Sequence, residues 1–264
     1  MRDNTLGRIG GMYFHYLHSM KRNPARLIEI LVWPAFEVLL FSLLAGSNRE
    51  GLTEVSRLTL SLLTGVVYWN STARIIQEAV AQYIDDFASK NIQHIMLAPV
   101  SSIEIAISIT AASLTKVLIS LIVLGGIIFL IVPAFFSTVF WGSVWYVIQL
   151  ELMGIAFSLF GISLVNLFGE RASFSGWMMS TVLQLVSLPF YPRTALPEPL
   201  QTLSYAIPAS FIFEDIRNQT ASGTLFSSSQ IIAFGESLIY LIMGALLVSW
   251  SLRVARRTGI FSKL

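Results

Sequence analysis

The chain has 264 residues, of which 55% are hydrophobic and only 12% are charged, with 17 basic and 15 acidic side chains. A soluble domain usually has about 25% charged residues, so this composition argues against a soluble enzyme, a disordered chain and a nucleic-acid-binding protein. The mean hydropathy of +0.70 instead predicts a polytopic membrane protein. The absence of cysteine excludes disulfides, thiolate metal sites and cysteine nucleophiles.

The segment over residues 5–23 precedes the first long apolar run and predicts an amphipathic helix. Its apolar residues recur at helical spacing, while its basic and histidine residues fall mostly on another face: Leu6, Ile9, Tyr13, Tyr16, Leu17 and Met20 against Arg8, His15, His18 and Lys21. Asn23 and Pro24 end the pattern, so we expect this helix to lie in the membrane interface. It either serves as a basic anchor alone or also borders a cytoplasmic partner, and both can hold.

Six segments are apolar over the ~20 residues that a helix needs to cross a bilayer. They cover about residues 27–46, 58–76, 103–132, 139–168, 174–190 and 231–252. The third and fourth are longer than a bilayer requires, so we expect them to tilt or to extend beyond it. Gly154, Ser158 and Gly161 form a stripe of small residues in the fourth, which favours close helix packing.

The basic residues predict the orientation. Five Lys and Arg residues precede the first apolar segment and four follow the sixth, so the two ends hold nine of the 17 basic side chains. The turn over residues 133–138 holds none. Because basic residues gather on the cytoplasmic side, we expect both termini in the cytoplasm. We also expect a single membrane domain over residues 1–264.

The expected inner segment over residues 77–100 is too long for a tight turn and too polar to lie in lipid. Apolar side chains within it predict a short amphipathic helix over residues 83–98: Ile84, Phe87, Ile92, Ile95 and Met96. A helix that exposes such side chains needs something to cover it. The lipid headgroups and a cytosolic protein are equally good covers on physical grounds.

The segment over residues 191–217 follows the fifth apolar run on the expected outer side. Four prolines interrupt an otherwise apolar sequence, so neither half is long enough to cross a membrane. We expect a broken helical hairpin that dips into the outer leaflet, which is tolerated where the backbone is buried in protein or lines a cavity. Four aromatic residues are expected near an outer gate, where they either pack or contact substrate: Phe190, Tyr191, Phe211 and Phe213.

A few charges fall inside the apolar segments, where each costs about 2.5–3.5 kcal/mol on insertion scales. Lys116 and Glu151 lie roughly 24 and 20 Å from the outer turn that joins their segments, at about 1.5 Å per residue. We therefore expect them to form an ion pair, although each could instead reach the interface or bond elsewhere. Glu37 follows Pro34 in the first segment and is expected either to face a cavity or to hydrogen-bond across a dimer interface.

No catalytic or metal-binding motif is recognisable. His15, His18 and His94 have no metal-ligand neighbours in sequence, and no Ser-His-Asp set or pair of catalytic carboxylates occurs. The chain contains no Gly-Lys pair and hence no G-x-x-x-x-G-K-[ST] phosphate-binding loop. If ATP drives this protein, another polypeptide hydrolyses it.

Two stretches give the chain its resemblance to a known family. FASKNIQHIMLAPVSSIEI (87–105) resembles a coupling segment that ends in an L-x-P-[VL]-S-x-x-E pattern: Leu97, Pro99, Val100, Ser101 and Glu104. LPEPLQTLSYAIPASFIFEDIR (196–217) resembles a second family stretch, through Leu196, Pro197, Leu200, Pro208, Phe211, Glu214 and Arg217. With the six apolar segments, these features resemble the transmembrane subunit of an ABC transporter of the type-2 exporter (ABC-2) class. Asp85-Asp86-Phe87 departs from the family, many of whose members have a Glu-Arg-rich run there.

The resemblance implies an all-α polytopic fold: six transmembrane helices, an interfacial N-terminal helix, a cytoplasmic coupling helix and an outer re-entrant hairpin. It implies two permease subunits, more plausibly identical than different, with the first and fifth spans near their interface. Two cytoplasmic ATPase subunits would bind ATP and Mg, and this chain would bind no cofactor. The residues expected to contact the ATPase are Tyr83, Ile84, Asp85, Asp86, Phe87, Lys90, Ile95 and Met96.

The resemblance also implies export across the bacterial cytoplasmic (inner) membrane. The expected substrate is an amphiphile: a drug-like compound, a lipid or a lipid-linked glycan. Polysaccharide export by the same family is one alternative. A membrane-embedded assembly or regulatory protein without translocation is a second, and an intramembrane enzyme is a third.

Overall fold

The computed structural model describes residues 5–22, 28, 32, 34–37, 39–40, 57–89, 91–131, 141–222 and 228–258. This part of the chain is all-helical, with no strand. Its α-helices are α1 (Thr5–Arg22), α3 (Arg57–Ala88), α4 (Asn91–Leu97), α5 (Ser102–Ile131), α7 (Trp141–Phe168), α8 (Ser175–Ser187), α9 (Glu198–Ser204), α10 (Pro208–Ser222) and α11 (Ser228–Thr258). Two short 3₁₀ helices, η2 (Gly169–Ala172) and η3 (Arg193–Ala195), lie between them.

Within the described residues, three helices are long and apolar enough to cross a membrane. They cover Ser102–Ile127, Val144–Ala172 and Ser228–Thr258, where the third, fourth and sixth spans were predicted. The predicted first span, 27–46, falls largely outside the described residues. Where the second was predicted, α3 has 32 residues and extends about 48 Å, well beyond a hydrocarbon core of about 30 Å.

The helix at the predicted fifth span is short. α8 has only 13 residues, because the chain turns at Leu188, whose φ of 64° is left-handed, and Pro189 follows. A helix of this length extends about 20 Å, less than the thickness of the hydrocarbon core. The six-span topology therefore stays a prediction.

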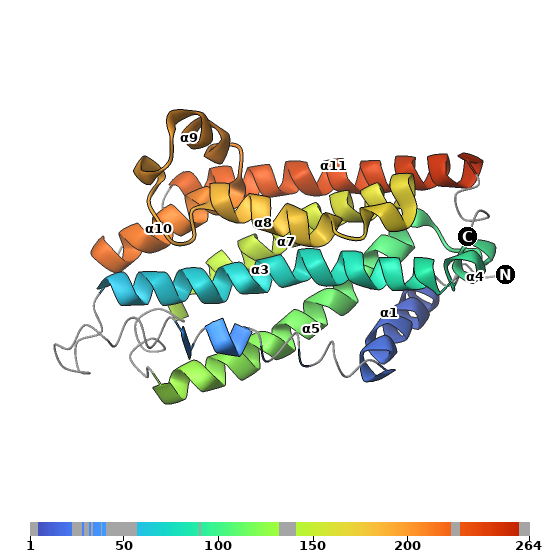
Figure 1. The fold of residues 1–264 in the computed structure, drawn as a ribbon, viewed down its shortest axis with the longest axis horizontal. Helices are drawn as coiled ribbons and strands as arrows, with labels where there is room; N and C mark the ends of the chain where they lie inside the picture. The colour runs from blue at the N-terminus through green and yellow to red at the C-terminus, as the bar shows by residue number, and fades with distance from the viewer. Residues whose placement is uncertain are drawn as a thin grey trace.

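α7 lies at the centre of the bundle, packed along α11 and α3, while α5 and α8 pack against α3 and α1 lies against α5 (Figure 1). The predicted stripe of small residues explains this close packing. Gly154 meets the carbonyl of Thr72, at 3.2 Å from where a Cβ would be, and Gly161 leaves no room for one beside Val80. On α11, Gly244 meets the backbone of α7 in the same way.

Buried apolar side chains form two clusters at opposite ends of the bundle. The α4-end cluster joins α1, α3, α4, α5, α7 and α11 and includes Tyr16, Phe87 and Ile92. The α10-end cluster joins α3, α7, α8 and α10 and includes Trp69 and Phe213. α1, α4 and the last turns of α11 lie at one end of the molecule, and α9 and α10 lie at the other (Figure 1).

The structure corrects one predicted element and refines two others. The single helix expected over residues 83–98 is instead two: the end of α3, which stops at Ala88, and the separate helix α4, which begins at Asn91. A helix, α1, lies where an interfacial helix was expected over 5–23, and its place in the membrane interface stays a prediction. Two helices, α9 and α10, lie where a broken outer hairpin was expected over 191–217, with α10 continuing to Ser222, and its place in the outer leaflet stays a prediction.

Candidate functional site

The turn between α4 and α5 is held by a capping box. The backbone N–H of Ser101 donates to Oε2 of Glu104 at 2.6 Å, and the backbone N–H of Glu104 donates to Oγ of Ser101 at 3.2 Å. This reciprocal pair satisfies two donors that a helix start would otherwise leave without partners. The S-x-x-E part of the sequence pattern is therefore the start signal of α5, and it fixes where the preceding turn lies.

The same glutamate connects the turn to α1. Nε and Nη2 of Arg8 both donate to Oε1 of Glu104, at 3.0 and 2.7 Å. Further along the two helices, the hydroxyls of Tyr13 and Thr115 lie 3.0 Å apart. α1 is thus fixed to α5 by polar contacts as well as by packing. The sequence pattern predicted Arg8 on a polar helix face but did not predict this partner.

A second polar group fixes the end of α3 to α1 and α4. Asn91 at the start of α4 donates to Oδ1 of Asp86 at 2.9 Å, and Nε2 of His15 lies 3.1 Å from the same oxygen. Tyr16 is buried beside this carboxylate, and burial, followed by the charge of Asp86, raises the pKa of its hydroxyl well above the usual value. Asp86 is therefore an internal contact of the α1–α3–α4 junction.

The residues predicted to contact an ATPase divide into two groups. Tyr83, Asp86 and Phe87 are buried within the chain, at 1%, 6% and 1% exposure, so they are not available at this surface. Asp85 is exposed, and Ile84 and Ile95 are half-buried, so these three reach the surface. Lys90 and the side chain of Met96 lie outside the described residues.

The most exposed apolar side chain at this end is Leu97, at 84%. Ala98, Pro99 and Ser101 are exposed beside it, so residues 97–101 form a projecting turn, called the α4–α5 tip below. Leu97 belongs to the family pattern but was not among the residues predicted to contact the ATPase. Its place at the end of an apolar run, two residues before a proline, was the available signal.

The predicted ion pair between Lys116 and Glu151 is replaced by a different one. Nζ of Lys116 donates to Oε1 of Glu78 on α3 at 2.7 Å, and both side chains are buried. One turn along α3, Gln82 donates to Ser113 of α5 at 2.9 Å. These contacts form a polar seam between α3 and α5, and its Glu78–Lys116 pair lies between the two apolar clusters along both helices. Glu151 is buried on α7 beside Ser71 of α3.

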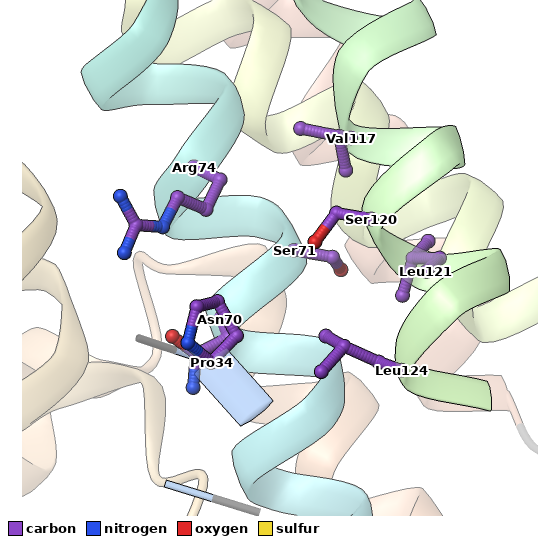
Figure 2. A pocket seen from close by; sticks show the side chains of 8 residues that line it. All are labelled: Pro34, Asn70, Ser71, Arg74, Val117, Ser120, Leu121 and Leu124. Carbon is purple, nitrogen blue, oxygen red and sulfur yellow. The ribbon is translucent and has the colours of Figure 1, made fainter. Parts of the chain in front are cut away.

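A small hollow lies beside this seam, between α3, α5 and Pro34 (Figure 2). The space in it that the centre of a water molecule can occupy is about 10 Å³, enough for about one water and far below the roughly 300–1,000 Å³ typical of small-molecule sites. Ser71 and Ser120 face each other across it, whereas the guanidinium of Arg74 extends away from α5 (Figure 2). Glu37 accepts a hydrogen bond of 2.5 Å from Asn70, which lines the hollow. In this conformation the hollow is too small for a drug-like molecule.

At the opposite end, Arg193 holds the hairpin of α9 and α10 together. Its Nη2 donates to Oγ of Ser210 at 3.0 Å and lies 3.3 Å from Oε2 of Glu214. Its guanidinium also lies over the ring of Tyr205, 3.8 Å from the centroid, in a cation–π contact. Nearby, Gly65 of α3 lies so close to the carbonyl of Pro189 that a Cβ there would overlap the oxygen.

The four aromatic residues expected near a gate mostly pack inside the protein. Phe213 is buried in the α10-end cluster, with its ring centroid 6.4 Å from that of Trp69. Phe190 and Phe211 are half-buried against the same cluster. Tyr191 donates its hydroxyl to the carbonyl of Leu185 at 2.5 Å. Of the two interpretations offered by the sequence, the contacts in this conformation are those of packing.

Comparison with known proteins adds no relative. No family model matches the sequence, and no curated protein gives a significant match. Within the described residues, no group of three or more His, Asp or Glu side chains could hold a metal ion. The part of the chain that the structure describes is helical and has three helices that are long and apolar enough to cross a membrane.

Proposed function

We propose that this chain is the membrane-spanning subunit of an ATP-driven exporter of the ABC-2 type in the bacterial cytoplasmic membrane. The observation that carries the proposal is the α4–α5 tip. It exposes Leu97 while the capping box of Ser101 and Glu104 and the ion pair with Arg8 fix its base. An exposed apolar side chain on a rigidly held turn is suited to docking into a pocket of a partner protein.

The partner in this proposal is a cytoplasmic ATPase that binds ATP and Mg, because the chain has no phosphate-binding loop of its own. The tip lies between α4 and α5, and α4 follows α3 after a short break. A push on the tip would therefore act on α3 and α5 together. Both termini would lie on the same cytoplasmic side, since α1 and the end of α11 lie at the tip's end of the bundle (Figure 1).

A second copy of the chain would complete the exporter. α8 exposes an apolar stripe at helical spacing that either lipid or a second copy can cover: Phe174, Trp177, Met178, Val182 and Leu185. The outer hairpin of α9 and α10 would border the exit of the path between the copies. The substrate in this proposal is an amphiphile that enters from the cytoplasm or the inner leaflet.

Co-purification from native membranes tests the proposal. A tagged chain should retain an ATPase with a phosphate-binding loop, and Leu97→Asp should weaken that association about tenfold or more, since burial of a leucine is worth roughly 1.5–3 kcal/mol. Leu203→Asp on α9 is the matched control, because Leu203 is also exposed but lies at the opposite end. Absence of an ATPase, or equal loss with both variants, would contradict the proposal.

A further inference from the structure

Three buried side chains form a series of hydrogen bonds, called the Tyr83–Asn166–Ser251 chain below, that links α3, α7 and α11 close to the α4–α5 tip. The hydroxyl of Tyr83 donates to Oδ1 of Asn166 at 2.5 Å, and Nδ2 of Asn166 donates to Oγ of Ser251 at 3.1 Å. Ser251 in turn donates to the carbonyl of Val248 at 3.1 Å. The exposure of the three linked side chains is 1%, 1% and 0%.

Each hydrogen bond of the Tyr83–Asn166–Ser251 chain has a defined donor and a defined acceptor. Asn166 uses its carbonyl oxygen toward α3 and its amide nitrogen toward α11, so rotating the amide by 180° would break both contacts. Burial raises the pKa of Tyr83 and keeps its hydroxyl protonated as the donor. Apolar side chains of the buried α4-end cluster neighbour Asn166 and Ser251 along α7 and α11: Ile162, Val165 and Leu252. A hydrogen bond in such surroundings is costly to break.

The Tyr83–Asn166–Ser251 chain lies where movement of the α4–α5 tip would reach it. Tyr83 lies five residues before the end of α3, and Asp86, one turn later, accepts the hydrogen bond from Asn91 of α4. Asn166 and Ser251 lie near the ends of α7 and α11, and these two helices pack together along their length. A displacement of the last turns of α3 can therefore act on both helices through the hydrogen bonds of Asn166, in addition to the direct packing of α3 along α7.

We infer that the Tyr83–Asn166–Ser251 chain transmits movement of the coupling region to α7 and α11, with Asn166 as the positioning residue. This inference rests on the proposed function, since an ATPase must supply the movement. α7 and α11 run from this end to the end that carries α10 (Figure 1), so a shift at Asn166 displaces the far end of the bundle as well. A purely structural role would stabilise the bundle without controlling how far the movement spreads.

Site-specific fluorophores separate the two roles, because the chain has no cysteine of its own. In the complex with its ATPase, Ala88→Cys reports on the end of α3, and Ile231→Cys reports on the start of α11; both positions are exposed. ATP with vanadate should shift the fluorescence at both labels in the unsubstituted complex. Tyr83→Phe and Ser251→Ala, which remove one hydroxyl each, should keep the shift at residue 88 and reduce that at residue 231 by at least half.

Tyr146→Phe is the matched control. Tyr146 of α7 accepts a hydrogen bond of 3.0 Å from Gln230 of α11, so this variant also removes a buried hydroxyl between the same two helices, but at the α10 end. It should leave both fluorescence shifts intact. An undiminished shift at residue 231 in Tyr83→Phe and Ser251→Ala would overturn the inference while the proposed function stands. A bound ATPase with no ATP-dependent shift at residue 88 in the unsubstituted complex would overturn both.

Discussion

The α4 end of the bundle and the hairpin of α9 and α10 use polar contacts in different ways. At the α4 end, hydrogen bonds join helices that are far apart in sequence: Arg8 to Glu104 spans 96 residues, and Tyr83 to Asn166 spans 83. In the hairpin, Arg193 instead reaches Ser210, only 17 residues away. The α4 end is therefore built as a junction of several helices, whereas the polar contacts of Arg193 lie within the hairpin and apolar packing holds α10 to the bundle.

This difference bears on how each end can move. A displacement of one helix at the α4 end disturbs polar partners on several others, so movement there involves the whole bundle. The hairpin keeps its own contacts when it shifts, because Ser210 and Tyr205 move with Arg193. The α4 end is therefore suited to transmitting force between helices, and the hairpin is suited to moving as one body. Four experiments test this contrast.

The largest effect is expected at the polar seam between the two ends. Lys116→Met leaves the Glu78 carboxylate buried without its partner, which costs about 3–5 kcal/mol. Thermal unfolding in detergent should show a large drop in Tm. The double variant Glu78→Leu/Lys116→Met should recover most of this loss, because it removes both charges. Additive losses would mean that the pair does not couple α3 to α5.

A smaller and more local effect is expected in the hairpin. Arg193→Ala removes the cation–π contact with Tyr205 and the hydrogen bond to Ser210, together about 2 kcal/mol. Limited proteolysis should then cut residues 196–207 faster while α1 keeps its resistance. Arg193→Lys keeps the charge but loses the planar fork, so it should give an intermediate rate. Equal loosening of α1 would contradict the view that the hairpin is a separate unit.

At the α4 end, Glu104→Ala should affect two helices at once. The variant removes both the cap of α5 and the partner of Arg8, so amide exchange should increase in α1 as well as in the first turn of α5. Ser101→Ala removes only one half of the capping box and is the matched control, which should leave exchange in α1 unchanged. A response confined to α5 in Glu104→Ala would show that packing alone holds α1.

The smallest effect at neutral pH is expected for Tyr16. Its pKa in the folded protein is raised by burial and by Asp86, so the folded state favours the protonated hydroxyl. Its contribution to stability is complete below the unfolded pKa of about 10 and is lost as pH rises above it. Urea unfolding between pH 9 and 11 should show this loss, and Tyr16→Phe should reduce it. The same slope in both proteins would rule out Tyr16 as its source.

The long apolar helices could be predicted from the sequence because length and hydropathy define them locally. α5, α7 and α11 lie where three spans were predicted, and the stripe of Gly154 and Gly161 packs closely as expected. The length of α3 was missed. Its last turns are polar enough to resemble a loop, and they are helical because Tyr83 and Phe87 are buried against helices that lie elsewhere in sequence.

The contacts of the site were harder to predict for the same reason. Lys116 was assigned a partner on the next helix along the chain, but α5 makes few contacts with α7 and packs instead on α3, which supplies Glu78. Glu104 was recognised within a pattern, whereas its pairing with Arg8 depends on how α1 lies across α5. Sequence spacing cannot reveal which of two neighbouring helices carries a buried partner.

The absent side chain at Gly65 has a practical consequence. Because α3 meets the carbonyl of Pro189 there with no atom between the backbones, the first added carbon must push the root of the hairpin outward. Gly65→Ala thus inserts one methyl group at this contact, far from the α4–α5 tip. It would let an experimenter loosen the far end of the molecule while its opposite end stays chemically intact.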